Sequence, residues 1–226
     1  MKTSRSRTWP TPLSGFTLLE LLVVIGIIAL LSSLAGPAIT SISKGSQMNQ
    51  ALAEVGGLLE EARQYAIAKN TYVWVAFEDS RAGEDDQLRV AVLASKSGTD
   101  LPVWGTDDTT GAAAQTVLLN RISTFKNVKL SGANTFGSGQ IPDLSAVANA
   151  GDLGVAAFTV RLPGGGQGSF SKAVQFTPAG EARNAETLIG AIDFGLQPTR
   201  GRAADVRNVA VVRVNGLTGQ RAIFRP

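Results

Sequence analysis

The stretch that decides the fold is LSGFTLLELLVVIGIIALL, residues 13–31. From Phe16 to Leu34 the only polar residues are Thr17, Glu20, Ser32 and Ser33. As a helix this run spans about 29 Å at ~1.5 Å per residue, close to the ~30 Å hydrocarbon core of a bilayer. The residues before it are polar and basic and contain two prolines, so no stable helix is expected there. The sequence therefore predicts a membrane-spanning helix with a cytoplasmic N-terminus.

Glu20 separates three interpretations of this stretch. A secretory signal peptide has a shorter apolar core of ~7–15 residues and a following cleavage site of small residues. Such a site is conceivable near Ala35–Gly36, but the apolar run is long and contains a carboxylate. An ordinary signal anchor fits the length and leaves Glu20 unexplained. Because a central charge costs roughly 3 kcal/mol in a bilayer, a charged residue there usually has a partner.

The third interpretation supplies that partner. Gly15-Phe16-Thr17-Leu18-Leu19-Glu20 and the apolar run after it resemble the type III signal of type IV pilins and type II secretion pseudopilins. The resemblance implies that a prepilin peptidase cleaves between Gly15 and Phe16 and N-methylates Phe16. Glu20 is then the fifth mature residue, and its carboxylate can pair with the cationic amine of Phe16, within one subunit or across to a neighbour.

A second helical pattern follows the membrane segment. Gly36 and Pro37 predict a helix break, since proline removes a backbone donor. The resemblance implies local unwinding there during assembly, and a simple kink is the alternative. Apolar residues then recur at intervals of three and four, which indicates an amphipathic helix to about residue 69. The members of this stripe are Met48, Ala51, Leu52, Val55, Leu58, Leu59, Ala62, Tyr65 and Ala66.

The remainder of the chain is rich in β-strand signals. Predicted strands, from their β-branched and aromatic content, are 71–77, 88–93, 116–122, 156–162, 173–176, 188–194, 209–214 and 222–224. Residues 215–219 read as a hairpin loop, and 95–115 and 131–154 as long surface loops.

The predicted fold is α+β. A long N-terminal helix, its first half transmembrane, packs on an antiparallel β-sheet, as in pilins. The expected divisions are a leader peptide (1–15), a transmembrane helix (16–35), its amphipathic continuation (36–70) and a globular β-rich domain (71–226).

Three short sequence motifs resemble those of the minor pseudopilin H and FimT type. They are Leu59-x-x-Ala62-Arg63-x-x-Ala66, Phe176-x-Pro178-x-Gly180 and Thr218-Gly219-Gln220-Arg221. The segments 62–67 and 70–75 also resemble the prepilin-like proteins called Verru_Chthon cassette protein D. That narrower resemblance implies a gene cassette of related membrane-anchored proteins.

Composition argues against most catalytic chemistry. The chain has no Cys and no His, so it lacks disulfides, thiol nucleophiles, Cys/His zinc sites and imidazole acid–base groups. The net charge of +3 comes from the first fifteen residues, since 18 basic and 18 acidic residues follow. No nucleic-acid partner, cofactor or enzymatic activity is predicted.

Acidic residues crowd two predicted loops. Asp79, Glu84, Asp85 and Asp86 lie in one loop, and Asp107 and Asp108 in another. Their oxygens would suit Ca²⁺, but the spacing matches no known ligand loop, so a solvated acidic turn is the preferred interpretation and calcium the weaker one.

The sequence thus predicts a structural subunit. It would be processed by a prepilin peptidase and assembled with other pilin-like subunits into a type IV pilus-like or type II secretion pseudopilus filament. Before assembly it would be a single-pass inner-membrane protein with its C-terminal domain in the periplasm. The alternative is a membrane-anchored extracytoplasmic binding domain that uses the same signal and does not polymerise.

Overall fold

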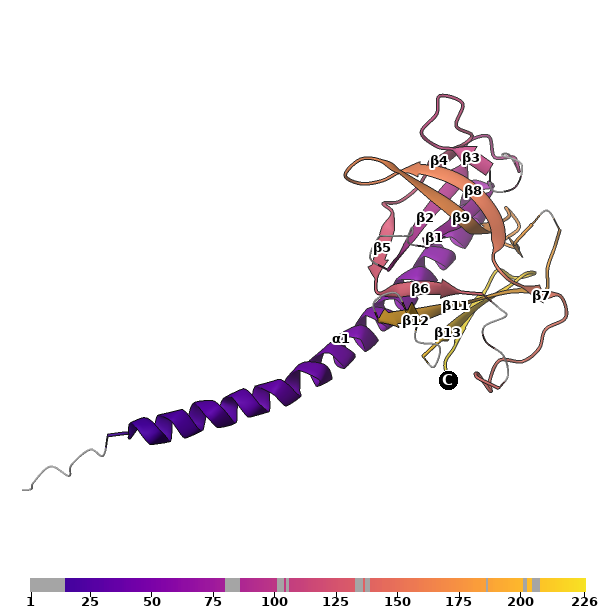
Figure 1. The fold of residues 1–226 in the computed structure, drawn as a ribbon. Helices are drawn as coiled ribbons and strands as arrows, with labels where there is room; N and C mark the ends of the chain where they lie inside the picture. Colours follow the sequence, from indigo (N-terminus) through magenta and orange to yellow (C-terminus); the bar gives the residue numbers. More distant parts are fainter. Residues whose placement is uncertain are drawn as a thin grey trace, which may run out of the picture. The chain divides into compact units, whose positions relative to one another are not determined.

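The structure is a computed structural model. It describes residues 15–79, 86–100, 104, 106–132, 136, 139–185, 187–200, 203–204 and 208–226, without the side chains of 33–45, 200, 203 and 204. The chain divides into two compact units, Met1–Ser43 and Lys44–Pro226. One helix, α1 (Leu18–Lys69), belongs to both units, and the described strands all lie in the second (Figure 1).

Both ends of α1 are set by local hydrogen bonds. At the start, the Thr17 hydroxyl accepts a bond from the Glu20 amide (3.2 Å), as an N-cap residue does. At the end, Asn70 adopts φ 51°, and the amides of Asn70 and Thr71 bond the carbonyls of Ile67 (3.4 Å) and Ala66 (3.1 Å). This is a Schellman motif, in which asparagine tolerates the left-handed conformation.

The helical assignment continues through Gly36 and Pro37, where the sequence predicted a break. The predicted break is therefore wrong as far as secondary structure is concerned, because one helix spans both residues. A proline costs a helix one donated hydrogen bond, and the flanking turns keep theirs. Unwinding at this point during assembly stays a prediction.

The first sheet contains eight strands: β1 (Val73–Asp79), β2 (Gln87–Ser95), β3 (Thr106–Asp108), β4 (Thr116–Leu118), β5 (Ser123–Lys126), β8 (Gly154–Arg161), β9 (Gln167–Phe176) and β10 (Ala182–Arg183). Its order is β3-β8-β9-β1-β2-β4. β5 also pairs with β2, and β10 with β9. All pairs are antiparallel except β3 with β8.

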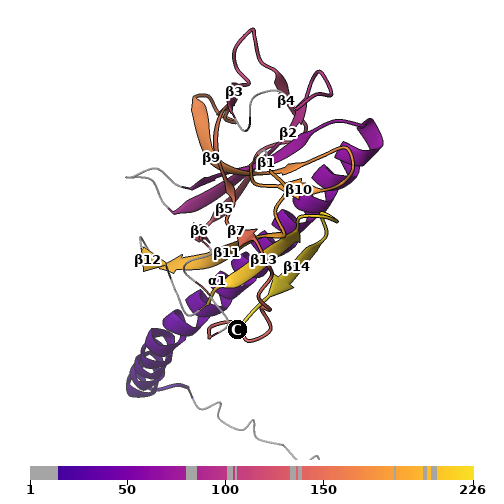
Figure 2. The same ribbon diagram turned by 90° about the vertical axis from the view of Figure 1, so that its right-hand side faces the viewer.

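The second sheet contains six strands: β6 (Val128–Ser131), β7 (Ala150–Gly151), β11 (Ala191–Arg200), β12 (Ala203–Ala204), β13 (Ala210–Asn215) and β14 (Arg221–Phe224). Its order is β12-β11-β13-β14, and β6 and β7 pair with β11 as well. The predicted α+β class is confirmed, but the single predicted sheet is in fact two sheets (Figure 2).

The main core lies between the second half of α1 and one face of each sheet. The predicted stripe is buried except at Tyr65, which is partly buried: Leu59 is 1% exposed, and Ala51, Val55, Ala62 and Ala66 are fully buried. It packs with Phe77 of β1 and Phe194 of β11, whose ring centroids are 5.2 Å apart. The 3–4 spacing therefore identified the helix face that the sheets cover.

Each sheet also buries residues on its other face. Trp74 of β1 packs against Phe158 of β8 with ring centroids 5.9 Å apart, so the central strand is buried on both sides. The outer face of the second sheet holds a smaller cluster around Ile141 and Val211. Phe77 and Phe176 belong to the main core, Trp74 to the cluster on the other face of the first sheet, and Tyr72 is partly buried there.

Candidate functional site

The N-terminal motif lies where α1 begins. Gly15, Phe16 and Thr17 precede the helix, and Glu20 falls in its first turn. A Cβ added to Gly15 would meet no atom within 4 Å, and the Phe16 side chain is 76% exposed. Thr17 and Glu20 thus hold the N-cap and N3 positions, where a carboxylate is favoured by the helix dipole. Apart from Gly15, the predicted leader lies outside the described residues.

Around this start, α1 is apolar on every side. Twelve large apolar residues are exposed: Phe16, Leu18, Leu19, Leu21, Leu22, Val23, Val24, Ile25, Ile27, Ile28, Leu30 and Leu31. We call these twelve residues the apolar sleeve. Exposed apolar area of this extent marks an interaction surface. Among the described residues, no helical segment reaches the length and hydropathy required of a membrane span.

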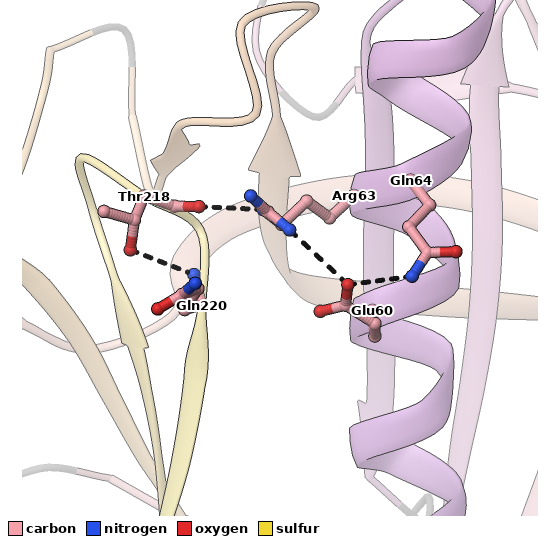
Figure 3. Close-up of polar contacts among 5 residues, drawn as sticks. All are labelled: Glu60, Arg63, Gln64, Thr218 and Gln220. Atoms are coloured by element: carbon pink, nitrogen blue, oxygen red, sulfur yellow. Dashed lines mark hydrogen bonds and ion pairs between the residues drawn. The ribbon is translucent and has the colours of Figure 1, made fainter.

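The three motifs that resemble minor pseudopilins meet around Arg63 of α1. Figure 3 shows two of them, on the helix and in the turn that contains Thr218. The Arg63 Nε donates to the carbonyl of Thr218, in the β13–β14 turn (2.8 Å). Its Nη1 bonds Glu60 (3.4 Å), which also accepts from Gln64 (2.9 Å). Arg63 therefore ties the helix to the C-terminal hairpin.

Two glycines make room for Arg63. Gly180 and Gly219 have φ +83° and +64°, a conformation that side-chain-bearing residues rarely adopt. A Cβ on Gly219 would lie 2.2 Å from the Gly180 carbonyl and 2.9 Å from Cδ of Arg63. The sequence pattern thus identified a packing arrangement between a helix and two turns.

The acidic candidates have mostly structural partners. The Asp79 carboxylate accepts a bond from the Leu130 amide at 3.0 Å, which links the two sheets. Burial raises the pKa of Asp79, and the Leu130 bond and the charges of Lys129 and Lys172 oppose that rise. The Asp107 carboxylate accepts hydrogen bonds from the amides of Gln115 and Thr116. The Asp108 carboxylate accepts bonds from the hydroxyl and amide of Thr110, and these bonds lower the pKa of Asp108.

No group of three metal-ligating side chains occurs in the part of the chain that the structure describes. Of the calcium candidates, Glu84 and Asp85 lie outside the described residues. Asp86 is half-buried at the start of β2 and is close enough to Asp79 to raise its pKa further. The calcium interpretation therefore gains no support and stays untested at two of its four residues.

Sequence reasoning missed a polar row along one side of α1. Gln47, Glu54 and Glu61 accept bonds from Asn127 (3.1 Å), Ser123 (2.7 Å) and Asn120 (2.8 Å). The helix acceptors are seven residues apart, which places them on one side of the helix, and this spacing was the available signal. These three hydrogen bonds hold the segment that contains β5 against α1.

Sequence reasoning also missed a buried ion pair on the outer face of the second sheet. Arg213 and Asp193 lie opposite each other on β13 and β11 and make two bonds of 2.7 Å. The remaining Arg213 nitrogen donates to the carbonyl of Ser145 (2.6 Å), which holds the loop before β7 against the sheet. The bond to Asp193 raises the pKa of Arg213.

Comparisons with known proteins bear on the N-terminal part of the chain first. Residues 14–36 match the family described as "Prokaryotic N-terminal methylation motif". The chain is also similar to "Fimbrial protein EcpC" of Eikenella corrodens, at 34% identity over 103 residues. That alignment covers 44% of this chain and 65% of the relative. No solved structure matches the chain.

The two similarities leave the minor pseudopilin subtype and the cassette resemblance as predictions. The family match over residues 14–36 includes Gly15, Phe16 and Glu20, which lie at the start of α1. The chain thus carries a prepilin-type N-terminal motif at residues 14–36 and is similar to a fimbrial protein, of whose length it spans 65%.

Proposed function

We propose that this chain is a structural subunit of a type IV pilus-like or type II secretion pseudopilus filament. A prepilin peptidase cleaves between Gly15 and Phe16 and methylates Phe16. The subunit then waits in the inner membrane, with its β-rich domain in the periplasm, until the apolar sleeve packs against the sleeves of other pilin-like subunits.

The observation that carries this proposal is the apolar sleeve itself. Leu18 is 87% exposed, and the least exposed member, Val24, is still 44% exposed. Burial of apolar area is worth roughly 25 cal/mol per Å², so such a helix is stable only with lipid or other apolar helices around it. A filament core built of neighbouring sleeves provides the second of these environments.

Glu20 has a specific part in the proposed assembly. Glu20 lies in the first turn of α1, four residues after the Phe16 amine that the proposed cleavage would create, which supports an ion pair between the two groups. A buried ion pair is tolerable, whereas either charge alone costs several kcal/mol. Pairing within one subunit or with a neighbour therefore makes it possible to bury both groups in the helix bundle.

The β-rich domain contributes no catalytic group to this proposal. Among its buried polar groups, the Arg213–Asp193 pair and the Asp79–Leu130 bond join structural elements. We infer a structural role without enzymatic activity, and partners limited to the peptidase, sibling subunits and the membrane.

The test compares Glu20→Leu, Glu20→Gln and Thr17→Val in full-length chains. Thr17→Val removes the cap oxygen that bonds the Glu20 amide and keeps the carboxylate, so it separates capping from ion pairing. Cleavage and the amount of protein in the membrane should be normal in all three. Both Glu20 variants should be at least about tenfold depleted from sheared filaments, because an unpaired charge costs more than 1.4 kcal/mol.

Equal recovery of all variants in membrane and filament fractions would contradict the pairing role. Absence of the wild-type chain from any assembled fraction would contradict the filament proposal. The second result would instead support an anchored binding domain that does not polymerise.

A further inference from the structure

Each sheet ends beside α1 in a strand with one unpaired edge. β5 pairs with β2, and β14 pairs with β13, and neither strand has a second neighbour among the described residues. β14 is the outermost strand of the second sheet in Figure 2, and β5 borders the first sheet in Figure 1. An unpaired edge presents backbone donors and acceptors that can pair with another strand.

The register shows which groups of β5 point outward. The Asn127 amide bonds the Asp86 carbonyl (2.8 Å), in line with the pairing of β5 and β2. Antiparallel residues alternate between inward and outward hydrogen-bonding groups. The amide and carbonyl of Thr124 and Lys126 therefore point away from β2, and neither residue makes an outward hydrogen bond in the described part of the chain.

The same reasoning applies to β14. The Asn215 amide bonds the Gln220 carbonyl (2.8 Å), so Ala222 and Phe224 face β13. Arg221 and Ile223 then point their backbone groups outward, and these groups too lack hydrogen-bond partners among the described residues. On each edge, two residues with outward backbone groups are separated by one residue whose groups face the sheet. An additional antiparallel strand requires this alternation.

The two edges lie on opposite flanks of α1. β5 is fastened through Ser123 to Glu54, whereas the Arg221 guanidinium of β14 lies over Gly56, where an added Cβ would be 2.5 Å from its Nη1. Two residues correspond to about 200° around a helix of 3.6 residues per turn. Subunits whose helices stand side by side would therefore bring the β5 flank of one copy to the β14 flank of the next.

There is room for a strand beside β5. A groove of about 770 Å³ follows this edge, with Glu54, Asn120, Arg121, Ser123, Thr124 and Pro163 in its lining. A smaller hollow continues from it along Gln47, Gln50 and Lys126. The groove and the hollow together are lined by one carboxylate, Glu54, and two cations, Arg121 and Lys126, so groups of both signs are present beside this edge.

We propose that β5 of one copy pairs with β14 of the next copy and joins the first sheet of one subunit to the second sheet of its neighbour. The contact is heterologous, because two different surfaces meet, and such contacts generate an open helical array when the rotation between copies does not close a ring. This proposed pairing of β5 with β14 rests on the proposed assembly into a filament. Packing of the sleeves raises the effective concentration of the two edges, so that strands of four residues are sufficient.

The test uses the absence of cysteine from the chain. Full-length Thr124→Cys and Ile223→Cys chains are coexpressed, and sheared filaments are treated with a short thiol crosslinker. Thr124 is exposed, and Ile223 is 39% exposed, so neither change disturbs the core. A dimer that joins one chain of each kind is expected, and the chain with both cysteines should give a ladder of longer products.

Two controls make the result specific. Either single-cysteine chain alone should give no dimer, because in the proposed contact β5 does not meet β5 and β14 does not meet β14. Val155→Cys paired with Ile223→Cys should also give none, since Val155 lies in β8 and is 84% exposed. Dimers in these controls as strong as in the test pair would overturn the proposal.

Failure of this inference differs from failure of the proposed function. If the double variant is recovered in filaments and forms no crosslink, edge pairing is wrong and assembly stands. If neither the wild-type chain nor the variant enters filaments, both proposals are wrong.

Discussion

The first and second parts of α1 differ in the pattern of their apolar residues and in how far those residues are buried. In the apolar sleeve, every large apolar side chain is at least 44% exposed. In the segment Met48–Ala66, the apolar residues form one stripe, and the polar residues Gln50, Glu54, Glu61 and Gln64 lie outside it and are exposed. The second part has its partner within its own unit, and the proposed assembly would supply partners for the first.

The contrast shows what a hydrophobic pattern can specify. A stripe identifies a helix that packs on its own sheets. A helix that is apolar all round identifies a surrounding medium of lipid or other helices. The following experiments test that difference, beginning with the largest expected effect.

Gly15→Val should abolish processing, and Gly26→Val should leave it intact. Both glycines have open space where a Cβ would be added, so neither change strains the fold. A branched side chain at Gly15 would instead obstruct the proposed peptidase site. The measurement is the fraction of chain that retains its leader, by electrophoretic mobility. Normal cleavage of Gly15→Val would show that the cut is made elsewhere.

Leu59→Ala should lower the free energy of unfolding by about 2–5 kcal/mol, because Leu59 is 1% exposed in the main core. Leu217→Ala is the control: Leu217 is 63% exposed, and its loss should change stability by less than about 0.5 kcal/mol. Denaturant unfolding of residues 44–226 measures both. A loss below about 1 kcal/mol for Leu59→Ala would place the stripe on the wrong face.

Gly219→Ala and Gly57→Ala should have effects of opposite sign. The first forces a Cβ against the Gly180 carbonyl at positive φ and should destabilise by about 1–3 kcal/mol. The second adds a methyl group to an exposed helical position with free space and should stabilise by about 0.5–1 kcal/mol. Thermal unfolding compares the two. Equal effects would mean that the turn at Gly219 does not pack on Arg63 as described.

The smallest effect concerns Asp79. Because its folded pKa is raised, mainly by burial, the native state holds this proton more tightly than the unfolded chain. Its contribution to stability is therefore fully present below the unfolded pKa and is lost as pH rises through the folded pKa. The stability of wild type minus that of Asp79→Asn should fall as pH rises across this window.

Asp108→Asn provides the opposite slope for comparison. Bonds to Thr110 lower the pKa of Asp108, so its stabilising contribution is present above the unfolded pKa and is lost as pH falls through the folded pKa. Unfolding measurements on residues 44–226 at several pH values test both carboxylates. Parallel slopes for the two variants would contradict the burial of Asp79.

The helix and most long strands could be predicted from the sequence, because each carries a periodic pattern or a β-branched run. Short strands such as β5 and β6 could not, since their four residues contain too little pattern. The division into two sheets was also missed, because register and long-range pairing depend on tertiary contacts such as the Phe77–Phe194 contact.

At the candidate site, local signals led to the predictions for Gly15, Phe16 and Glu20, and the family match over residues 14–36 includes all three positions without testing their roles. The motifs that contain Arg63, Gly180 and Gly219 were found by resemblance. Only the three-dimensional structure shows that the two glycines pack against the Arg63 side chain. The edges of β5 and β14 depend on hydrogen-bond direction, which the sequence does not encode residue by residue.

The most direct test of the central claim is intact-mass and N-terminal peptide mass spectrometry of the mature protein from its native membrane. The expected chain begins at Phe16, carries one methyl group on its amine and retains the whole apolar sleeve. A chain that begins near Gly36, or that retains Met1, would contradict the account, because the sleeve would then be discarded as a signal peptide or kept as an unprocessed anchor.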